Sequence, residues 1–390
     1  MDSDDAEAKS DALLRRATQL RAAGREHYAK NQHEACAAAY AELERIERSL
    51  GHEEGLAEAR FWHGAALHGR GRLSEALFVF GRSIDETELS IADPSLYMTI
   101  TRFLRAMVEL PFPRAEIEDA FGQVEQQLRD AKLDDRRSRL LLARARLALS
   151  RGRPRDALAL GEESLARWRR ETHTFTGSSH YWVVVTACLW LGDLPRARRH
   201  LEAWAALREG GAMQRVFLAC KSSELARREG ELGRALALSR GAWIESAMGE
   251  DHQQRMFAGH AYLRALLLAG RLEPAREVLA RLFRRLHRVE FAEHGFVLRA
   301  LHADWHLARA RHAAGLPMLD PECGVERRTR RPGAERAVAE PALARARRLY
   351  ARALAHGREL DRLLATRLRA WEIEARLALC DRTEGELARR

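Results

Sequence analysis

One short phrase recurs along this chain about every forty residues, and it constrains the fold more than any other feature. It consists of an apolar stretch, a turn that contains glycine, and a polar residue before an alanine that opens a second apolar stretch. The clearest copy is Leu67-His68-Gly69-Arg70-Gly71-Arg72-Leu73-Ser74-Glu75-Ala76. The alanines of the copies are Ala35, Ala76, Ala157, Ala197, Ala235 and Ala275, and the double interval after Ala76 predicts a degenerate copy near residues 111–120. A repeat of this length is typical of a solenoid, in which stacked units share one continuous core.

Each part of the phrase has a physical reason in a pair of helices. Glycine tolerates the left-handed conformation that ends the first helix. Pro154, Pro195 and Pro274 stand at the first turn of the second helix, where a missing N–H is not needed. The small alanine allows two helices to cross closely. Apolar residues on either side fall at spacings of three and four, so we predict two helices per repeat and no strand.

The copy with Gly64, Leu67, Ala76 and Phe80 resembles the tetratricopeptide repeat. The interval of about forty residues is similar to the longer-helix variety found in sensor arms of bacterial transcriptional activators and signalling ATPases. The resemblance implies an all-α fold, a right-handed α-solenoid of about eight helix-turn-helix repeats. We therefore expect a single solenoid over residues 12–390, preceded by an acidic N-terminal tail over residues 1–11.

One segment departs from the repeat. Residues 316–341 stand where a short turn is due, and they contain four prolines and an arginine run. We predict an exposed loop, because long loops without secondary structure in compact proteins are functional or disordered. Its basic residues, a candidate cleavage site or basic contact, are Arg327, Arg328, Arg330 and Arg331.

Composition narrows the setting of the protein. The net charge is +10, and only four of the 66 basic residues are lysine, which is typical of a GC-rich bacterial genome. The five cysteines are scattered and form no CxxC, as expected for reduced thiols in a cytoplasm. No stretch is long and apolar enough to span a bilayer. We expect a cytoplasmic protein with no membrane partner.

The sequence contains no catalytic signature. It has no phosphate-binding glycine loop and no G-x-S-x-G elbow. His302 and His306 lie one helical turn apart, but an HExxH site needs Glu where Ala303 stands, and no third ligand is nearby. We therefore predict no enzyme activity, no metal and no cofactor.

In tetratricopeptide solenoids the first helix of each pair lines the concave face, and such faces bind peptides or partner helices. Transferring the inward positions of the Phe61–Gly71 copy to the other repeats predicts a basic and aromatic partner-binding groove. Its residues are Phe61, His68, Arg139, Arg146, Trp182, Arg227, His260, Arg264, Trp305 and Arg309. Arginine forms bidentate hydrogen bonds with carboxylates, so an acidic segment or a C-terminal carboxylate is the favoured ligand. The competing interpretation is that an Arg-rich chain places arginine on every surface.

Three functions follow from these patterns. The favoured one is a non-enzymatic scaffold or regulatory, signalling adaptor for protein–protein interaction, with the groove as receptor. The second is a nucleic-acid-associated regulator that uses the basic C-terminal region, where Arg345, Arg347, Arg348 and Arg352 share one predicted helix. The third is a protease substrate or regulator that is cleaved in the Arg-rich loop. The sequence leaves the oligomeric state open.

Overall fold

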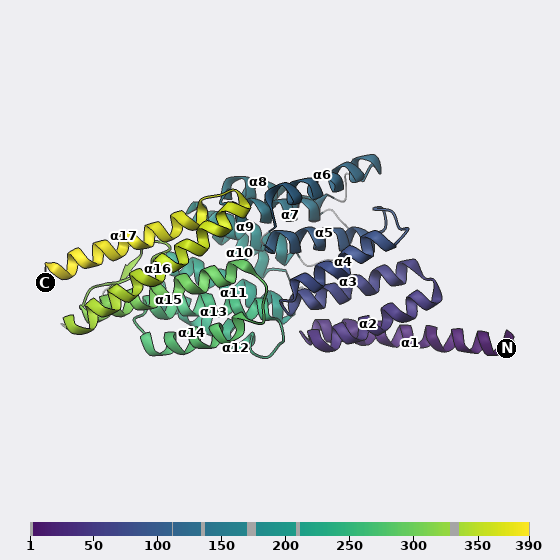
Figure 1. Ribbon diagram of the computed structural model, residues 1–390, viewed down its shortest axis with the longest axis horizontal. Helices are drawn as coiled ribbons and strands as arrows, with labels where there is room; N and C mark the ends of the chain where they lie inside the picture. The colour runs from purple at the N-terminus through teal and green to yellow at the C-terminus, as the bar shows by residue number, and fades with distance from the viewer. Residues whose placement is uncertain are drawn as a thin grey trace.

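The structure is a computed structural model, and it describes residues 3–110, 112–133, 137–169, 177–207, 211–327 and 335–389. Within these ranges the chain forms seventeen helices and one short two-stranded hairpin (Figure 1). The elements are α1 (Ser3–Ala29), α2 (His33–Leu50), α3 (Glu53–Gly69), α4 (Leu73–Glu86), α5 (Pro94–Glu109), α6 (Arg114–Asp130), α7 (Ser138–Ser150), α8 (Pro154–Trp168), α9 (Ser178–Leu191), α10 (Leu194–Ala205), α11 (Ala212–Arg228), α12 (Leu232–Glu245), α13 (His252–Leu268), α14 (Leu272–Leu286), α15 (Ala292–Ala313), β1 (Met318–Leu319), β2 (Glu326–Arg327), α16 (Arg336–Leu364) and α17 (Leu368–Ala388).

Consecutive helices pack as eight pairs, from α1/α2 to α15/α16, and α17 follows the last pair. This arrangement confirms the predicted all-α solenoid of about eight helix pairs. The two ends of the chain lie at opposite ends of the molecule in Figure 1. The first helix begins at Ser3, so residues 3–11, which we expected to form a tail, continue into α1.

The small residue at the helix crossing recurs at the fourth residue of the second helix in each pair. Ala76, Ala157, Ala197, Ala235 and Ala275 are fully buried at this position. In the first pair the position belongs to Cys36, which is fully buried, whereas Ala35 is exposed, so the predicted anchor was off by one residue. In the degenerate pair α5/α6 the position belongs to Ile117, also fully buried. The larger isoleucine explains why the repeat pattern is hidden there.

Backbone geometry also separates the degenerate pair from the others. In the regular pairs the residue that ends the first helix has a positive φ, for example +77° at Gly71 and +56° at Asn31. In α5/α6 the capping residue Leu110 is extended, with φ −95° and ψ 155°. The turn therefore follows a different path from that of the regular pairs. Pro113, whose ring fixes its φ, occupies the N-cap position of α6.

The solenoid winds far enough to touch itself, and the contacts repeat. Glu250 donates its N–H to the carbonyl of Asn31, and its carboxylate accepts a 2.7 Å hydrogen bond from the N–H of Glu34. Forty residues later, Glu290 binds the carbonyl of Gly71 and the N–H of Ser74 in the same way, at 2.6 Å for the latter bond. Both carboxylates thus cap the start of a helix that lies 216 residues away in sequence. We call these two contacts the seam.

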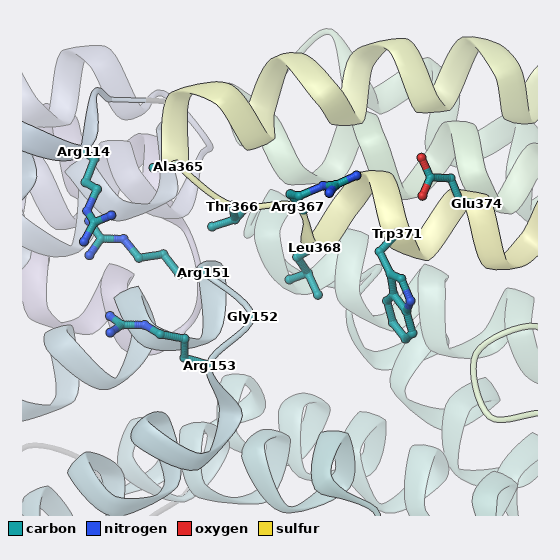
Figure 2. A pocket seen from close by; sticks show the side chains of 10 residues that line it. All are labelled: Arg114, Arg151, Gly152, Arg153, Ala365, Thr366, Arg367, Leu368, Trp371 and Glu374. Atoms are coloured by element: carbon teal, nitrogen blue, oxygen red, sulfur yellow. The ribbon is translucent and has the colours of Figure 1, made fainter.

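A further long-range contact joins the turn after α7 to the first residues of α17. Arg369 donates to the carbonyl of Ser150 at 3.1 Å, and Leu368 lies so close to Gly152 that a Cβ there would come within 3.1 Å of it. Figure 2 shows the crevice between the two turns, with Arg114, Arg153 and Arg367 at its rim and Trp371 beside it. The three contacts join helices that lie 216 to 219 residues apart in sequence.

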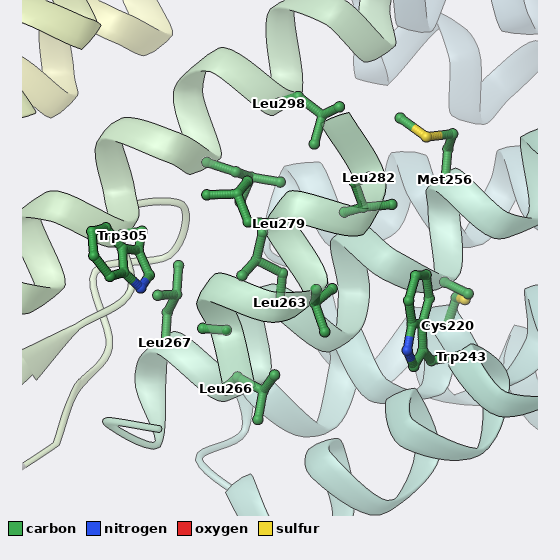
Figure 3. Close-up of a cluster of buried hydrophobic side chains, with 14 of the residues drawn as sticks. Cys220, Trp243, Met256, Leu263, Leu266, Leu267, Leu279, Leu282, Leu298 and Trp305 are labelled. Atoms are coloured by element: carbon green, nitrogen blue, oxygen red, sulfur yellow. The ribbon is translucent and has the colours of Figure 1, made fainter. Parts of the chain in front are cut away.

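Apolar layers between the pairs hold the solenoid together. In the largest layer Trp243, Met256, Leu279 and Leu282 belong to one cluster of buried side chains (Figure 3). A Cβ on Gly259 would meet Leu282 at 2.4 Å, so this glycine sets the distance between α13 and its neighbours. Each buried leucine contributes about 1.5–3 kcal/mol through loss of apolar surface to water. No helix in the described part of the chain has the length and apolar character to cross a membrane.

The expected loop at 316–341 proved partly structured. Leu316, Met318 and Leu319 are buried, and β1 pairs with β2 in antiparallel register. The helix α16 begins at Arg336, inside the expected loop, and tolerates Pro341 near its start. The prediction of an exposed loop is therefore wrong for residues 316–320, because apolar residues there pack into the solenoid core. Arg327 belongs to β2, whereas Arg328, Arg330 and Arg331 lie outside the described residues.

Candidate ligand-binding interior

A cavity of about 390 Å³ lies inside the solenoid. Its walls come mainly from the first helices of the pairs, from α1 to α13, which the seam brings around a common space. Residues on the walls include Tyr28, Trp62, His68, Arg102, Arg105, Arg146, Trp182, Phe217, Gln253 and Phe257. We call this space the central cavity. Its volume lies in the usual range of small-ligand pockets.

Aromatic rings form the apolar part of the wall. Trp182 meets Phe257 edge to face, with ring centroids 5.9 Å apart, and Phe257 meets Phe217 at 5.6 Å. On the opposite side Tyr28 meets Trp62 at 4.9 Å. Such edge-to-face pairs hold the rings rigidly, so the wall offers preformed apolar surface to a ligand.

Three guanidinium groups give the cavity its charge. Arg102 and Arg105 come from α5 and Arg146 from α7, and Glu109 lies among them. Glu109 accepts from Arg105 at 2.9 Å and from His68 at 2.7 Å, and it lies 3.6 Å from Arg146. One carboxylate thus serves two arginines and a histidine, and these cations hold its pKa well below its usual value.

Arg102 lacks a carboxylate. Among the described residues no acidic side chain lies within ion-pair distance of it, and its guanidinium stands over the ring of Phe61 at 6.0 Å. Burial lowers the pKa of Arg102, and burial together with Arg105 lowers the pKa of Arg146. These shifts record the free-energy penalty of holding cations away from water. The central cavity therefore favours an anion.

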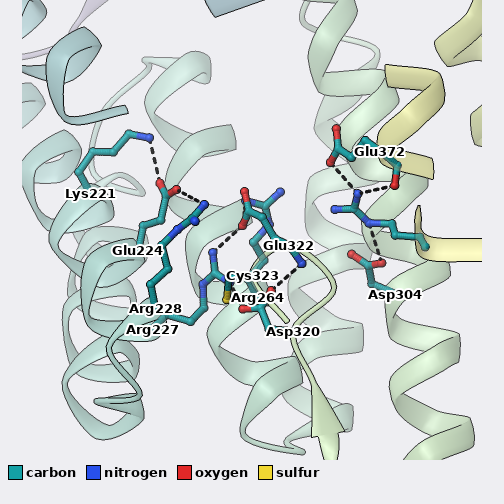
Figure 4. A network of polar contacts seen from close by, with 11 residues as sticks. Lys221, Glu224, Arg227, Arg228, Arg264, Asp304, Asp320, Glu322, Cys323 and Glu372 are labelled. Atoms are coloured by element: carbon teal, nitrogen blue, oxygen red, sulfur yellow. Dashed lines mark hydrogen bonds and ion pairs between the residues drawn. The ribbon is translucent and has the colours of Figure 1, made fainter. Parts of the chain in front are cut away.

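A second basic cluster lies further along the interior, and here the carboxylates are present. Arg227 of α11 pairs with both Asp320 and Glu322 of the hairpin, and Arg264 of α13 donates to Glu322 at 2.7 Å (Figure 4). Arg227 and Asp320 are buried. We call this the filled cluster. Its ion pairs lower the pKa of Glu322 far below its usual value.

One face of α11 joins the central cavity to the filled cluster. Phe217 lines the cavity, and one turn later Lys221 lies over the ring of Trp182, 5.3 Å from its centroid. Lys221 in turn pairs with Glu224 at 2.9 Å, and Glu224 pairs with Arg228 at 3.4 Å. The spacing of three and four along this stripe keeps all these side chains on the inner side of the helix. The interior is thus one continuous surface.

The predicted groove residues divide into four groups in the structure. His68, Arg146 and Trp182 line the central cavity, and Arg227 and Arg264 belong to the filled cluster. Phe61 is fully buried beneath Arg102, and Trp305 packs in the core with its indole N–H bonded to the carbonyl of Leu272 at 2.9 Å. The remaining three lie elsewhere: His260 is buried against His294, Arg139 is half-buried on α7, and Arg309 is exposed on α15.

Sequence reasoning missed several residues of the central cavity. Arg102 and Arg105 lie on the first helix of the degenerate pair, to which the inward positions were not transferred. Their spacing of three residues, with Glu109 a turn further on, was the available signal. Phe217 and Phe257 lie nearer the N-terminal ends of their helices than the transferred positions do.

The other candidates from the sequence have these surroundings. The rings of His302 and His306 are 5.3 Å apart, and burial lowers the pKa of both. No group of three His, Cys, Asp or Glu side chains suited to a metal ion occurs in the part of the chain that the structure describes. On α16, Arg347 pairs with Asp381 and Glu384 of α17, at 2.7 and 2.6 Å.

Comparisons with known proteins support the fold. No family model matches the chain, and no curated protein does. Among solved structures, a Rap protein complexed with Competence and Sporulation Factor is similar with a TM-score of 0.50 and 12% identity, over 97% of this chain and 99% of that one. A tetratricopeptide repeat protein from Parabacteroides merdae has a TM-score of 0.35 and 10% identity, over 90% and 100% of the two chains. Yeast Tom70 has a TM-score of 0.34 and 11% identity, over 95% of this chain and 96% of that one. The packed helix pairs and the likeness to the Rap structure together show a tetratricopeptide-like helical-repeat fold.

Proposed function

We propose that the protein is a non-enzymatic protein-interaction module, a scaffold or regulatory adaptor, that binds an acidic segment or the C-terminal carboxylate of a partner protein in its interior. The observation that carries this proposal is the central cavity, where Glu109 pairs with Arg105 and Arg146 while no described carboxylate lies within ion-pair distance of Arg102. The cavity wall also holds Asp251, whose carboxylate caps α13 by accepting hydrogen bonds from Gln254. Arg102 is partly withdrawn from water, and a ligand that brings a carboxylate beside its guanidinium offsets the free-energy cost of that desolvation on binding.

The walls of the cavity indicate what kind of anion fits. Arginine presents a planar fork of donors that matches a carboxylate, and the neighbouring rings of Trp182 and Phe257 offer apolar surface. A ligand with both a carboxylate and apolar side chains uses both features. A space of about 390 Å³ is too small for a folded domain, so the recognised part of the partner is a short extended segment. The Rap structure of the same fold was solved as a complex with a factor, which is consistent with a ligand-binding role.

Titration calorimetry with short peptides tests the proposal. The probes are peptides of about six residues with one to three Asp or Glu and an aromatic or leucine residue, each with a free and with an amidated C-terminus. We expect acidic peptides to bind, and Arg102→Gln to weaken binding at least tenfold, the effect of one lost charge-assisted hydrogen bond. Arg155→Gln is the matched control, because Arg155 is exposed outside the cavity and its loss changes the net charge equally. Equal binding to both variants would refute the proposed site.

A second candidate function rests on one feature of the surface crevice. Trp371 is 66% exposed, beside the exposed Arg114, Arg153 and Arg367 (Figure 2). An exposed ring among arginines can stack on a base of single-stranded nucleic acid. Fluorescence titration with a labelled oligonucleotide at low salt tests this role. Binding that falls steeply with salt and is lost in Trp371→Ala would support it, and no binding at low salt would exclude it.

A further inference from the structure

The tip of the hairpin places two carboxylates against the basic interior. Asp320 directly follows β1, and Glu322 lies in the turn between the strands. The side chain of Asp320 accepts the N–H of Glu322 at 2.9 Å, and its backbone carbonyl accepts the N–H of Gly324 at 2.9 Å. This tight turn projects both carboxylates toward Arg227, which contacts both, and Arg264, which contacts Glu322 (Figure 4).

The hairpin is a side branch of the solenoid rather than part of its repeat. It leaves after Gly315 at the end of α15, and the chain is back there by Glu335, whose N–H binds the carbonyl of Ala313 at 3.1 Å. Its base is fixed in the core, since Met318 is fully buried among the apolar residues of α13 and α15. Its tip is less enclosed: Glu322 keeps 20% of its side chain exposed, and Cys323 is partly exposed.

The arginines that the tip contacts belong to the same interior surface as the central cavity. Arg227 and Arg264 lie on the first helices of their pairs, as do Arg102 and Arg146 of the cavity. The stripe of α11 from Phe217 through Lys221 and Glu224 connects the two sites without a break. A partner segment that extends from the cavity along this stripe therefore reaches the carboxylates of the hairpin.

We propose that Asp320 and Glu322 form an internal stand-in for a partner's acidic segment, and that a segment with two carboxylates spaced two residues apart competes with them for Arg227 and Arg264. The identity of the competing partner rests on the proposed function. The contact of the hairpin's own carboxylates with Arg227 and Arg264 does not depend on it. The acidic partner gains the site when it displaces the tip, while the buried base of the hairpin keeps its place. The basic interior thus has an open part and a part that the chain itself occupies.

Binding of the hairpin in trans tests the proposal. The probe is a fluorescent peptide of residues 317–326, and the receptor is the full chain with Glu322→Gln, which frees Arg264. We expect the peptide to bind Glu322→Gln at least tenfold more tightly than the wild type, because the tethered tip competes at a high effective concentration. A peptide with Asn and Gln at positions 320 and 322 is the matched control and should bind neither protein. Equal binding of the acidic peptide to both proteins would overturn the proposal.

A second measurement uses the unmodified chain, so it does not depend on a variant that folds poorly. Cys323 lies at the tip, 3.6 Å from Arg227, and the other four cysteines are buried. We expect a saturating amount of the acidic hairpin peptide, made with Ser in place of Cys323 so that it carries no thiol, to raise the alkylation rate of Cys323 in the protein at least threefold. An unchanged rate would contradict displacement. In Arg102→Gln both responses should persist. If both responses persist but the acidic peptides fail to bind the central cavity, only the proposed function is refuted. If the acidic peptides bind the cavity but both responses are absent, only the role of the hairpin as a stand-in is refuted.

Discussion

The central cavity and the filled cluster use the same residue type on equivalent helices, yet their charges are balanced differently. In the cavity Arg105 and Arg146 pair with Glu109, and no carboxylate of the described residues lies within ion-pair distance of Arg102. In the filled cluster Arg227 and Arg264 meet two carboxylates from the hairpin. The difference shows that a basic interior in this fold is not by itself a stabilising feature, because its effect depends on whether the chain also supplies the anions.

This difference separates stability from function within one surface. A buried ion pair that is complete resists the loss of either partner, since the remaining charge is left without compensation. A buried cation that is incomplete lowers stability and is retained where a ligand completes it. In the absence of a ligand, mutation of the filled cluster should therefore lower the free energy of unfolding more than mutation of the central cavity does.

The largest loss of stability is expected when an ion pair of the filled cluster is broken. Arg227→Ala leaves Asp320 buried without its cation, so we expect a loss of about 3–5 kcal/mol in the free energy of unfolding. Arg102→Ala in the cavity removes a cation that has no carboxylate, so the same measurement should change by less than about 1 kcal/mol. Urea denaturation followed by circular dichroism measures both.

The triple variant Arg227→Leu, Asp320→Asn, Glu322→Gln supplies the control for this contrast. It removes the cation together with the two carboxylates, so most of the stability lost in Arg227→Ala should return. If Arg102→Ala proved as destabilising as Arg227→Ala, the two regions would not differ in the way their ion pairs suggest.

The repeat pattern was enough to predict the fold because the features that it encodes are local. Helix ends, caps and the alanine at the crossing are decided within about ten residues, so the phrase predicted the pairs from sequence alone. The one-residue error at Ala35 arose in the copy that lacks glycine: Asn31 takes the positive φ there, and Cys36 takes the crossing. Such a substitution keeps the geometry and hides the register.

Only part of the candidate site could be predicted from the same local pattern. Inward positions of the first helices could be transferred from one copy to the next, which brought His68, Arg146 and Trp182 to the central cavity. The seam depends on the pitch of the whole superhelix, so no local pattern marks Glu250 as the cap of a helix 216 residues away. The hairpin was hidden for another reason: its prolines suggest a loop, and its insertion depends on long-range contacts of Met318 and Asp320.

A smaller effect is expected when the charge of the filled cluster is titrated. Glu322 faces Arg264, Arg227, Arg228 and Arg376 as cations, with Glu224 and Asp320 as the nearby carboxylates. The arginines hold its folded-state pKa below the unfolded value, so its contribution is complete above about pH 4.5 and is lost as pH falls through the folded pKa.

Comparing the wild type with Glu322→Gln in urea melts at pH 7 and pH 3 isolates this contribution. The difference in unfolding free energy between the two proteins, on the order of 2 kcal/mol at pH 7, should shrink toward pH 3. A difference that grows on acidification would show that Glu322 is not held in its charged form by these arginines.

The smallest effect is expected at the seam, which holds the walls of the central cavity together without contributing to its charge. Glu290→Gln keeps the shape of the side chain but removes the negative charge at the start of α4, so we expect a loss of about 0.5–1 kcal/mol. Glu250→Gln removes the equivalent contact at the start of α2 and should cost the same. Since the two contacts lie forty residues apart in separate pairs, the double variant should show the sum of the two losses.

Hydrogen exchange at the amides of Ser74 and Glu34 reports each contact separately. Faster exchange at both amides in either single variant would mean that the seam opens as one unit, and the cavity would then depend on both contacts together.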